Sequence, residues 1–250
     1  MPRPTQTYPI MSTSNSANLP SALIAAPSDR ECLNDRLAEA ACYAVLRRLM
    51  PVLRHDVAGF MQPVRMLMMV LERRVHAPEP DMQAITKNVV SVSALTKQAT
   101  ADCINALEWI GSSQDAQVSL RSSVDEAIKL LAMELSANAL VLVNGISDDT
   151  LTAPQSFLRT VFMGSLLAFC DQCAAGGTLK VTFEAATNSH SAQRLELRLL
   201  QDDTDKPPAF KGLVRKYRLM DWLDVQAMAR PFGVTVTQAN DWLTLDLPKD

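Results

Sequence analysis

The chain has 250 residues, of which 48% are hydrophobic and 20% charged, and its formal net charge is -3. This composition is that of an ordinary globular protein with one large or two small domains, and the charge gives no electrostatic case for nucleic-acid binding. No apolar run approaches the roughly 20 residues of a membrane-spanning helix, and the N-terminus lacks the apolar segment of a signal peptide. Since an odd number of cysteines, five, fits a reducing compartment, we expect a cytoplasmic protein that binds neither nucleic acid nor membrane.

The N-terminal part of the chain reads as a leader followed by a long helix. Residues 1–27 are rich in Pro, Ser, Thr, Asn and Ala with almost no charge, which predicts a disordered segment. Ser28-Asp29-Arg30-Glu31 then has the pattern of a capping box. A helical pattern runs from there to about Val75, and we expect Pro51 and Pro63 each to bend it or to remove one backbone hydrogen bond.

His55 lies on this helix, on the face opposite its apolar stripe. At about 100° per residue, Val57, Phe60 and Val64 fall within about 40° of Leu53, whereas His55 falls about 200° away. We therefore predict that His55 points into solvent, next to the carboxylate of Asp56. An imidazole in that position can be reached by a partner protein and can act as a nucleophile.

A second helix is predicted from about Asp81 to Ile110, after the turn His76-Ala77-Pro78-Glu79-Pro80. Residues 28–111 then form a helical hairpin. A lone hairpin leaves its apolar face in water, and pairing with a second copy to form a four-helix bundle would bury it. We therefore expect a homodimer.

After a boundary at 111–115 the pattern becomes mixed α/β over residues 116–250. We expect a short strand at 118–120, a helix from a capping box at Ser123 to about 137, a strand at 140–143 and a helix from Pro154 to about 174. Strands at 178–185 and 193–200, a helix at 216–230 and strands at 234–238 and 242–247 follow. This order predicts a mixed sheet with helices on one face. Cys170 and Cys173 have CxxC spacing, but no second Cys or His pair lies near them in sequence, so we expect ordinary thiols rather than a zinc site.

The hairpin with its outward histidine, followed by this order of elements, resembles the catalytic core of bacterial two-component histidine kinases. The similarity covers roughly residues 29–250 and rests on Arg54-His55-Asp56, on the helix, Gly-Gly and strand of 161–181, and on the closing residues 243–248. It implies an α+β fold: a hairpin that dimerises into a four-helix bundle and carries the phosphoacceptor His55, then an ATPase-like α/β sandwich.

The motifs that bind ATP in that family are altered in this chain. The family's ATP-binding helix carries Asn-Leu-Leu-x-Asn-Ala, and the matching stretch is 165–170, with Phe169 in place of the Asn that helps to hold magnesium. The Asp-x-Gly-x-Gly motif corresponds to 201–208, which has no glycine. Only Gly212 and Gly233 follow Gly177, so a second glycine-rich phosphate loop is missing as well. We therefore predict a degenerate ATPase-like domain at 116–250 that binds no ATP and no metal.

The resemblance then implies a histidine phosphotransferase of a bacterial phosphorelay. His55 would exchange phosphate with the receiver domain of a response regulator, and Asp56 would accept a hydrogen bond from the ring or act as a general base. Since the receiver domain brings its own magnesium, we expect no cofactor in this chain. The expected partners are a second copy and a receiver domain or a histidine kinase.

Three alternatives remain at this stage. In the first, His55 is an exposed residue without a role on a helix that serves only to dimerise. In the second, the chain is a catalytically silent pseudokinase that regulates a kinase or a response regulator by binding. The third is an active autokinase, which would require Mg-ATP binding. A phosphatase role is disfavoured because the position one turn after His55, where such family members carry Thr or Asn, is Gly59.

Overall fold

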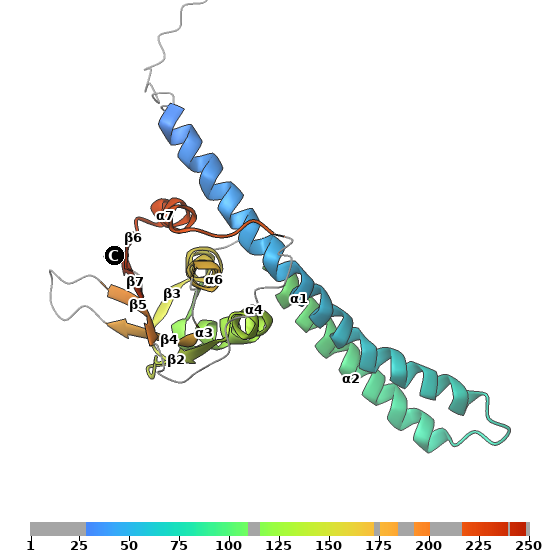
Figure 1. Cartoon of the computed structure of the whole chain (residues 1–250). Coiled ribbons are helices and arrows are strands. Elements are labelled where there is room, and N and C mark those ends of the chain that lie inside the picture. The colour runs from blue at the N-terminus through green and yellow to red at the C-terminus, as the bar shows by residue number, and fades with distance from the viewer. Residues whose placement is uncertain are drawn as a thin grey trace, which may run out of the picture.

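The computed structural model describes residues 29–109, 116–172, 176–184, 193–200, 217–239 and 241–248. Within these ranges two long helices precede an α/β domain (Figure 1). The predicted fold class, α+β with a helical hairpin followed by an α/β domain, is therefore confirmed. The predicted leader at 1–27, the capping residue Ser28, the boundary at 111–115 and Cys173 lie outside the described residues.

The hairpin consists of α1 (Asp29–Val75) and α2 (Met82–Leu107). Asp81 caps α2, because its carboxylate accepts hydrogen bonds from the backbone N–H groups of Gln83 and Ala84 at 3.0 Å. The helix α1 continues without interruption through Pro51 and Pro63. Only the second half of α1 pairs with α2, and its first half runs past the α/β domain beside α7 (Figure 1). None of the described helices is long and apolar enough to cross a membrane.

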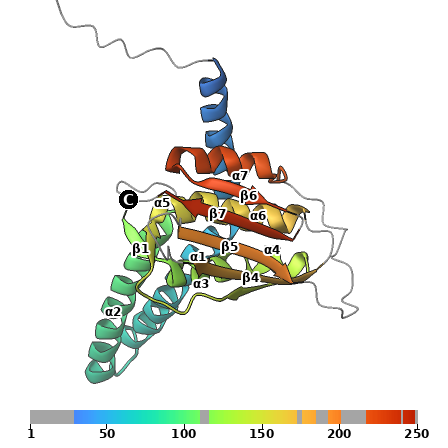
Figure 2. The same cartoon turned by 90° about the vertical axis from the view of Figure 1, so that its left-hand side faces the viewer.

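The α/β domain is built on a five-stranded mixed sheet of order β2-β4-β5-β7-β6, in which only β2 and β4 are parallel. Its strands are β2 (Leu140–Asn144), β4 (Gly177–Glu184), β5 (Gln193–Leu200), β6 (Thr235–Gln238) and β7 (Trp242–Leu247). A separate antiparallel pair is formed by β1 (Gln117–Ser119) and β3 (Thr152–Pro154), the latter not expected from sequence. The helices cover one face of the main sheet, as predicted (Figure 2).

The helices of this domain are α3 (Leu120–Leu130), α4 (Ala132–Ala137), α5 (Gln155–Phe157), α6 (Met163–Gln172) and α7 (Trp222–Ala229). A π-helical turn, η1 (Leu158–Phe162), joins α5 to α6, and a 3-10 turn, η2 (Arg230–Phe232), follows α7.

Two helix starts predicted from sequence are wrong. The helix expected from Ser123 begins at Leu120, because the Ser119 hydroxyl accepts from the Ser122 N–H at 3.3 Å and Leu120 is fully buried. The helix expected from 216 begins at Trp222, where Asp221 and Asp224 form a reciprocal capping box.

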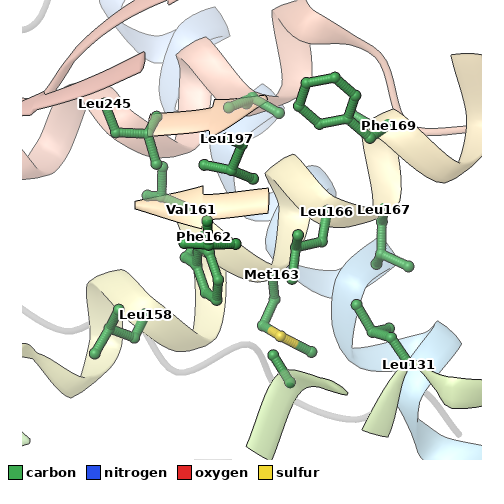
Figure 3. Packing of buried hydrophobic residues seen from close by; sticks show 14 of the residues in the cluster. Leu131, Leu158, Val161, Phe162, Met163, Leu166, Leu167, Phe169, Leu197 and Leu245 are labelled. Atoms are coloured by element: carbon green, nitrogen blue, oxygen red, sulfur yellow. The ribbon is translucent and has the colours of Figure 1, made fainter. Parts of the chain in front are cut away.

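The hydrophobic core extends from the sheet and its helices into α1. Leu197 and Leu245 of the sheet lie beside α6, whose residues from Met163 to Cys170 are all buried (Figure 3). Leu179 of β4 is fully buried in the same cluster. The same cluster includes four side chains of α1, which are Ala41, Val45, Leu49 and Leu53. The first half of α1 is thus packed as part of the α/β domain, while the second half belongs to the hairpin.

Candidate functional site

The structure places His55 on the solvent side of α1, as the spacing of the apolar residues predicts. Its side chain is 86% exposed. Leu53, on the opposite face, is buried, and Val57 and Phe60 are half-buried. The amphipathic pattern of α1 therefore presents the imidazole to solvent while the other face packs against protein.

Asp56 lies close enough to orient the imidazole ring. The Nδ1 atom of His55 is 3.3 Å from Oδ1 of Asp56, whose side chain is 41% exposed. A carboxylate can only accept a hydrogen bond, so this contact favours the tautomer that carries its proton on Nδ1. Nε2, on the other side of the ring, then has a free lone pair, which is the requirement for a nucleophile.

The surface next to His55 is open. A Cβ atom added at Gly59, one turn further along α1, would meet no atom within 4 Å. Ala58 and Gln62 on the same side are exposed. A partner can therefore approach the α1 backbone closely at this point, and Gly59 offers no side chain to orient a water molecule.

His76, at the start of the hairpin turn, is the other histidine within the described residues. It is exposed, and its Nδ1 atom lies 2.8 Å from the backbone carbonyl oxygen of Glu72. Its ring nitrogen is thus bound to the backbone at the end of its own helix, so His76 serves as a comparison for His55.

In α6, the stretch that corresponds to the family's ATP-binding helix is part of the core. Every residue from Ser165 to Cys170 is buried, and the Ser165 hydroxyl donates to the backbone carbonyl of Val161 at 2.7 Å. Phe169 packs edge-on against the ring of Trp222, with 5.1 Å between the centroids. An apolar ring cannot ligate a hard cation, and here it fills space between α6 and α7.

No metal site is evident in the part of the chain that the structure describes: no three His, Cys, Asp or Glu side chains come together there as ligands. Cys170 is a buried cysteine. The segment 201–208, which corresponds to the glycine motif, lies outside the described residues.

Arg48 is a buried charge that the sequence analysis missed. Its side chain is 4% exposed and donates to the carboxylates of Glu134 on α4, at 2.8 Å, and of Asp171 on α6. Asp171 also accepts from the backbone N–H of Met220 at 2.7 Å. Burial alone would lower the pKa of Arg48, but the hydrogen bonds with Asp171 and Glu134 outweigh burial and raise it. The guanidinium therefore stays charged and connects α1 to two helices of the α/β domain.

A second connection holds the end of α2. The indole N–H of Trp109 donates to Glu126 of α3 at 3.0 Å, and the guanidinium of Arg159 lies 4.9 Å from the centre of the Trp109 ring. Arg159 also donates to the backbone carbonyl of Glu108 at 2.6 Å. The hairpin is thus attached to the α/β domain at both of its helices.

In comparisons with known proteins, the sequence matched no protein-family model and no curated protein. Among solved structures, the molecule is similar to the histidine kinase AdeS of Acinetobacter baumannii, with a TM-score of 0.41 and 13% identity over 74% of this chain and 96% of that one. It is also similar to a histidine kinase of Burkholderia phymatum, with a TM-score of 0.37 and 15% identity over 81% and 95% of the two chains. A bacterial phosphotransferase gives a TM-score of 0.33 and 13% identity over 82% and 95%. Identities and TM-scores this low assign no function.

Proposed function

We propose that this chain is a histidine phosphotransferase that carries a phosphoryl group on His55, to or from the receiver domain of a response regulator, without binding ATP. The observation that carries this proposal is the 86% exposed His55 side chain with its Nδ1 atom 3.3 Å from a carboxylate oxygen of Asp56. Exposure makes the imidazole accessible to a second protein, and the carboxylate selects the tautomer that leaves Nε2 free to attack.

In the proposed reaction the lone pair of Nε2 attacks the phosphorus of an aspartyl phosphate on the receiver. The bond from phosphorus to the aspartyl oxygen breaks, and its electrons leave with the receiver's carboxylate. Positive charge then develops on the imidazole, and the carboxylate of Asp56 stabilises it through Nδ1–H. The reverse sequence passes the phosphoryl group to another receiver, and the receiver supplies the magnesium ion.

The burial of α6 supports the second half of the proposal, that no ATP is used. A nucleotide site requires polar groups that face a cavity. In this chain Phe169 and its neighbours on α6 are buried among apolar side chains, and Ser165 bonds to its own helix. Phosphate on His55 must then come from another protein.

A second candidate function is regulation by binding alone, as a silent pseudokinase. The hairpin supports this second function because it exposes several large apolar side chains. Such side chains provide a surface to which a partner can bind even if no phosphate is transferred. These are Met61, Met66, Met68, Met69, Val89 and Val90.

The deciding experiment is phosphate transfer from phosphorylated receiver domains of the same organism to the purified chain. We expect label on the wild type and on His76→Ala, no label on His55→Ala, and a reduced rate of labelling for Asp56→Asn. His76→Ala is the matched control, because it removes the other exposed histidine of the hairpin. Equal labelling of wild type and His55→Ala would refute the proposal, and stable binding of a receiver without any label would favour the pseudokinase.

A further inference from the structure

Pro51 lies four residues before His55 and weakens the helix at that point. Proline has no N–H group, so the carbonyl oxygen of Arg47 loses its helical hydrogen bond, and the ring crowds the preceding turn. Such a residue commonly kinks a helix or makes it a flexible joint. Yet α1 is one uninterrupted helix from Asp29 to Val75.

The α/β domain covers α1 on both sides of this weak point. Val45 and Leu49 before Pro51 and Leu53 after it belong to the same buried hydrophobic cluster as the core of the α/β domain, whereas Pro51 itself is exposed. The situation at Pro63 is different, because no described residue of α1 beyond Leu53 is buried. Of the two prolines, Pro51 is therefore the one whose flanking turns are both held by the α/β domain.

Polar contacts attach the same turn of the helix. Arg48 is paired with Glu134 and Asp171. The guanidinium of its neighbour Arg47 lies 5.7 Å from the centre of the Tyr217 ring. These contacts join the turn that Pro51 weakens to α4, to α6 and to the segment that precedes α7.

We propose that the α/β domain acts as a splint across Pro51, that is, it holds the helical turns on both sides of Pro51 in line. Arg48 is the positioning residue that attaches α1 to this domain. It thereby holds His55 in place for phosphate transfer, a role that rests on the function proposed above. Arg48 precedes His55 by seven residues, which is about 10.5 Å along the helix and about 20° around it. A fixed helix fixes the direction of the imidazole, and a reacting group that is held in position loses less freedom on reaching the transition state. A domain without nucleotide chemistry thus acquires a mechanical role.

Hydrogen exchange of the full chain tests the splint directly. The relevant amides are those of residues 52–55, whose helical hydrogen bonds span Pro51. In Arg48→Met, which keeps the aliphatic bulk but removes the charge, we expect these amides to exchange at least about tenfold faster than in the wild type. The amides of Leu179 and Leu197, in the centre of the sheet, are the reference for global stability. An equal acceleration of both sets would show that Arg48 supports general stability only, and would overturn the proposal.

The two prolines provide a matched control. In Arg48→Met combined with Pro51→Ala, the missing backbone hydrogen bond is restored, so residues 52–55 should regain wild-type protection. In Arg48→Met combined with Pro63→Ala they should remain fast. Equal rescue by both alanines would contradict a role at Pro51. If Arg48→Met does not fold, Glu134→Gln weakens the same contact from its half-exposed partner and should accelerate residues 52–55 in the same direction.

Phosphate transfer to His55 then separates this inference from the proposed function. We expect Arg48→Met to lower the transfer rate constant about tenfold and the added Pro51→Ala to restore it. Altered exchange with an unaltered transfer rate would overturn the positioning role. Absence of transfer in the wild type would refute the proposed function, whereas the exchange data would still decide whether the α/β domain splints α1.

Discussion

The helices α1 and α6 differ in what they expose. On α1, His55 projects into solvent beside Asp56 and next to the open surface at Gly59. On α6, every residue from Met163 to Cys170 is buried, including Phe169. One helix exposes an imidazole, and the other is enclosed in the core.

This difference indicates that α6 contributes mainly to stability, whereas the exposed part of α1 is available for binding or chemistry. A helix that binds a nucleotide must keep polar side chains at a cavity, which costs packing. By placing apolar residues there, α6 becomes a central element of the core against which α7, the sheet and the first half of α1 pack. We therefore expect substitutions in α6 to change stability and substitutions around His55 to change reactivity.

Phe169→Asn should have the largest effect, and it should be on stability. The change introduces a polar amide and removes a buried ring from its contact with Trp222. Loss of a buried Phe costs about 3–5 kcal/mol in the free energy of unfolding, and an amide without partners adds to this cost. Urea unfolding followed by circular dichroism measures the loss.

The matched control is Phe60→Asn on α1, where the ring is only half-buried; we expect a loss of about 1 kcal/mol there. Isothermal titration with Mg-ATP should show no binding for the wild type or for Phe169→Asn. Measurable affinity of the wild type for Mg-ATP would show that α6 does not exclude a nucleotide, and would favour an active autokinase.

Sequence alone was sufficient for the exposure of His55, because it follows from the angle between His55 and Leu53 on a helix. It also predicted that Phe169 provides no metal ligand, since the chemistry of the residue excludes it. Both inferences depend on local periodicity or on residue type. The mixed sheet with its helices on one face was likewise predictable from the order of elements.

What the sequence did not reveal depends on contacts between distant residues. Arg48 pairs with carboxylates 86 and 123 positions away, and nothing local says which carboxylates these are. No local signal marked Arg48, because it lies within about 20° of His55 around the helix, on the face opposite the apolar stripe, where a charge is expected in solvent. The start of α3 was misplaced for a related reason: burial of Leu120 and the Ser119 cap outweighed a plausible capping box at Ser123.

A second prediction concerns the outer face of the hairpin, and its effect is on association. The exposed apolar residues of α2 include Val89, which is 50% exposed in the single chain. If two hairpins form a four-helix bundle, Val89→Glu places a charge in the interface and should weaken the dimer about tenfold or more. Analytical ultracentrifugation over a range of concentrations gives the dissociation constant.

Met133→Glu is the control for that experiment. Met133 is the most exposed large apolar residue on α4, at 77%, but it belongs to the α/β domain. It should leave the dimer unchanged. A dimer that is sensitive to Met133→Glu and insensitive to Val89→Glu would place the interface on the α/β domain and would contradict the four-helix bundle.

The smallest effects come from a pair of glycines, one in each of the helices compared above. A Cβ atom at Gly59 of α1 would meet nothing within 4 Å, whereas at Gly164 of α6 it would lie 2.2 Å from the Cε atom of Met228. Replacing glycine by alanine inside a helix gains about 1 kcal/mol, so Gly59→Ala should raise the free energy of unfolding by that amount. At Gly164 the buried Met228 has to move, and overpacking of about 1–3 kcal/mol cancels or exceeds the gain.

Denaturant midpoints for the two variants therefore separate a helix with a free surface from one enclosed in a core. Equal stabilisation by both alanines would mean that the Met228 side chain moves aside at no energetic cost. The core around Gly164 of α6 would then be loosely packed. Gly59→Ala carries a second consequence, because its methyl group lies one turn from His55. If a receiver domain packs closely there, the more stable variant should accept phosphate more slowly than the wild type. A gain in stability accompanied by a loss in transfer would show that Gly59 is kept for access to His55 rather than for the helix.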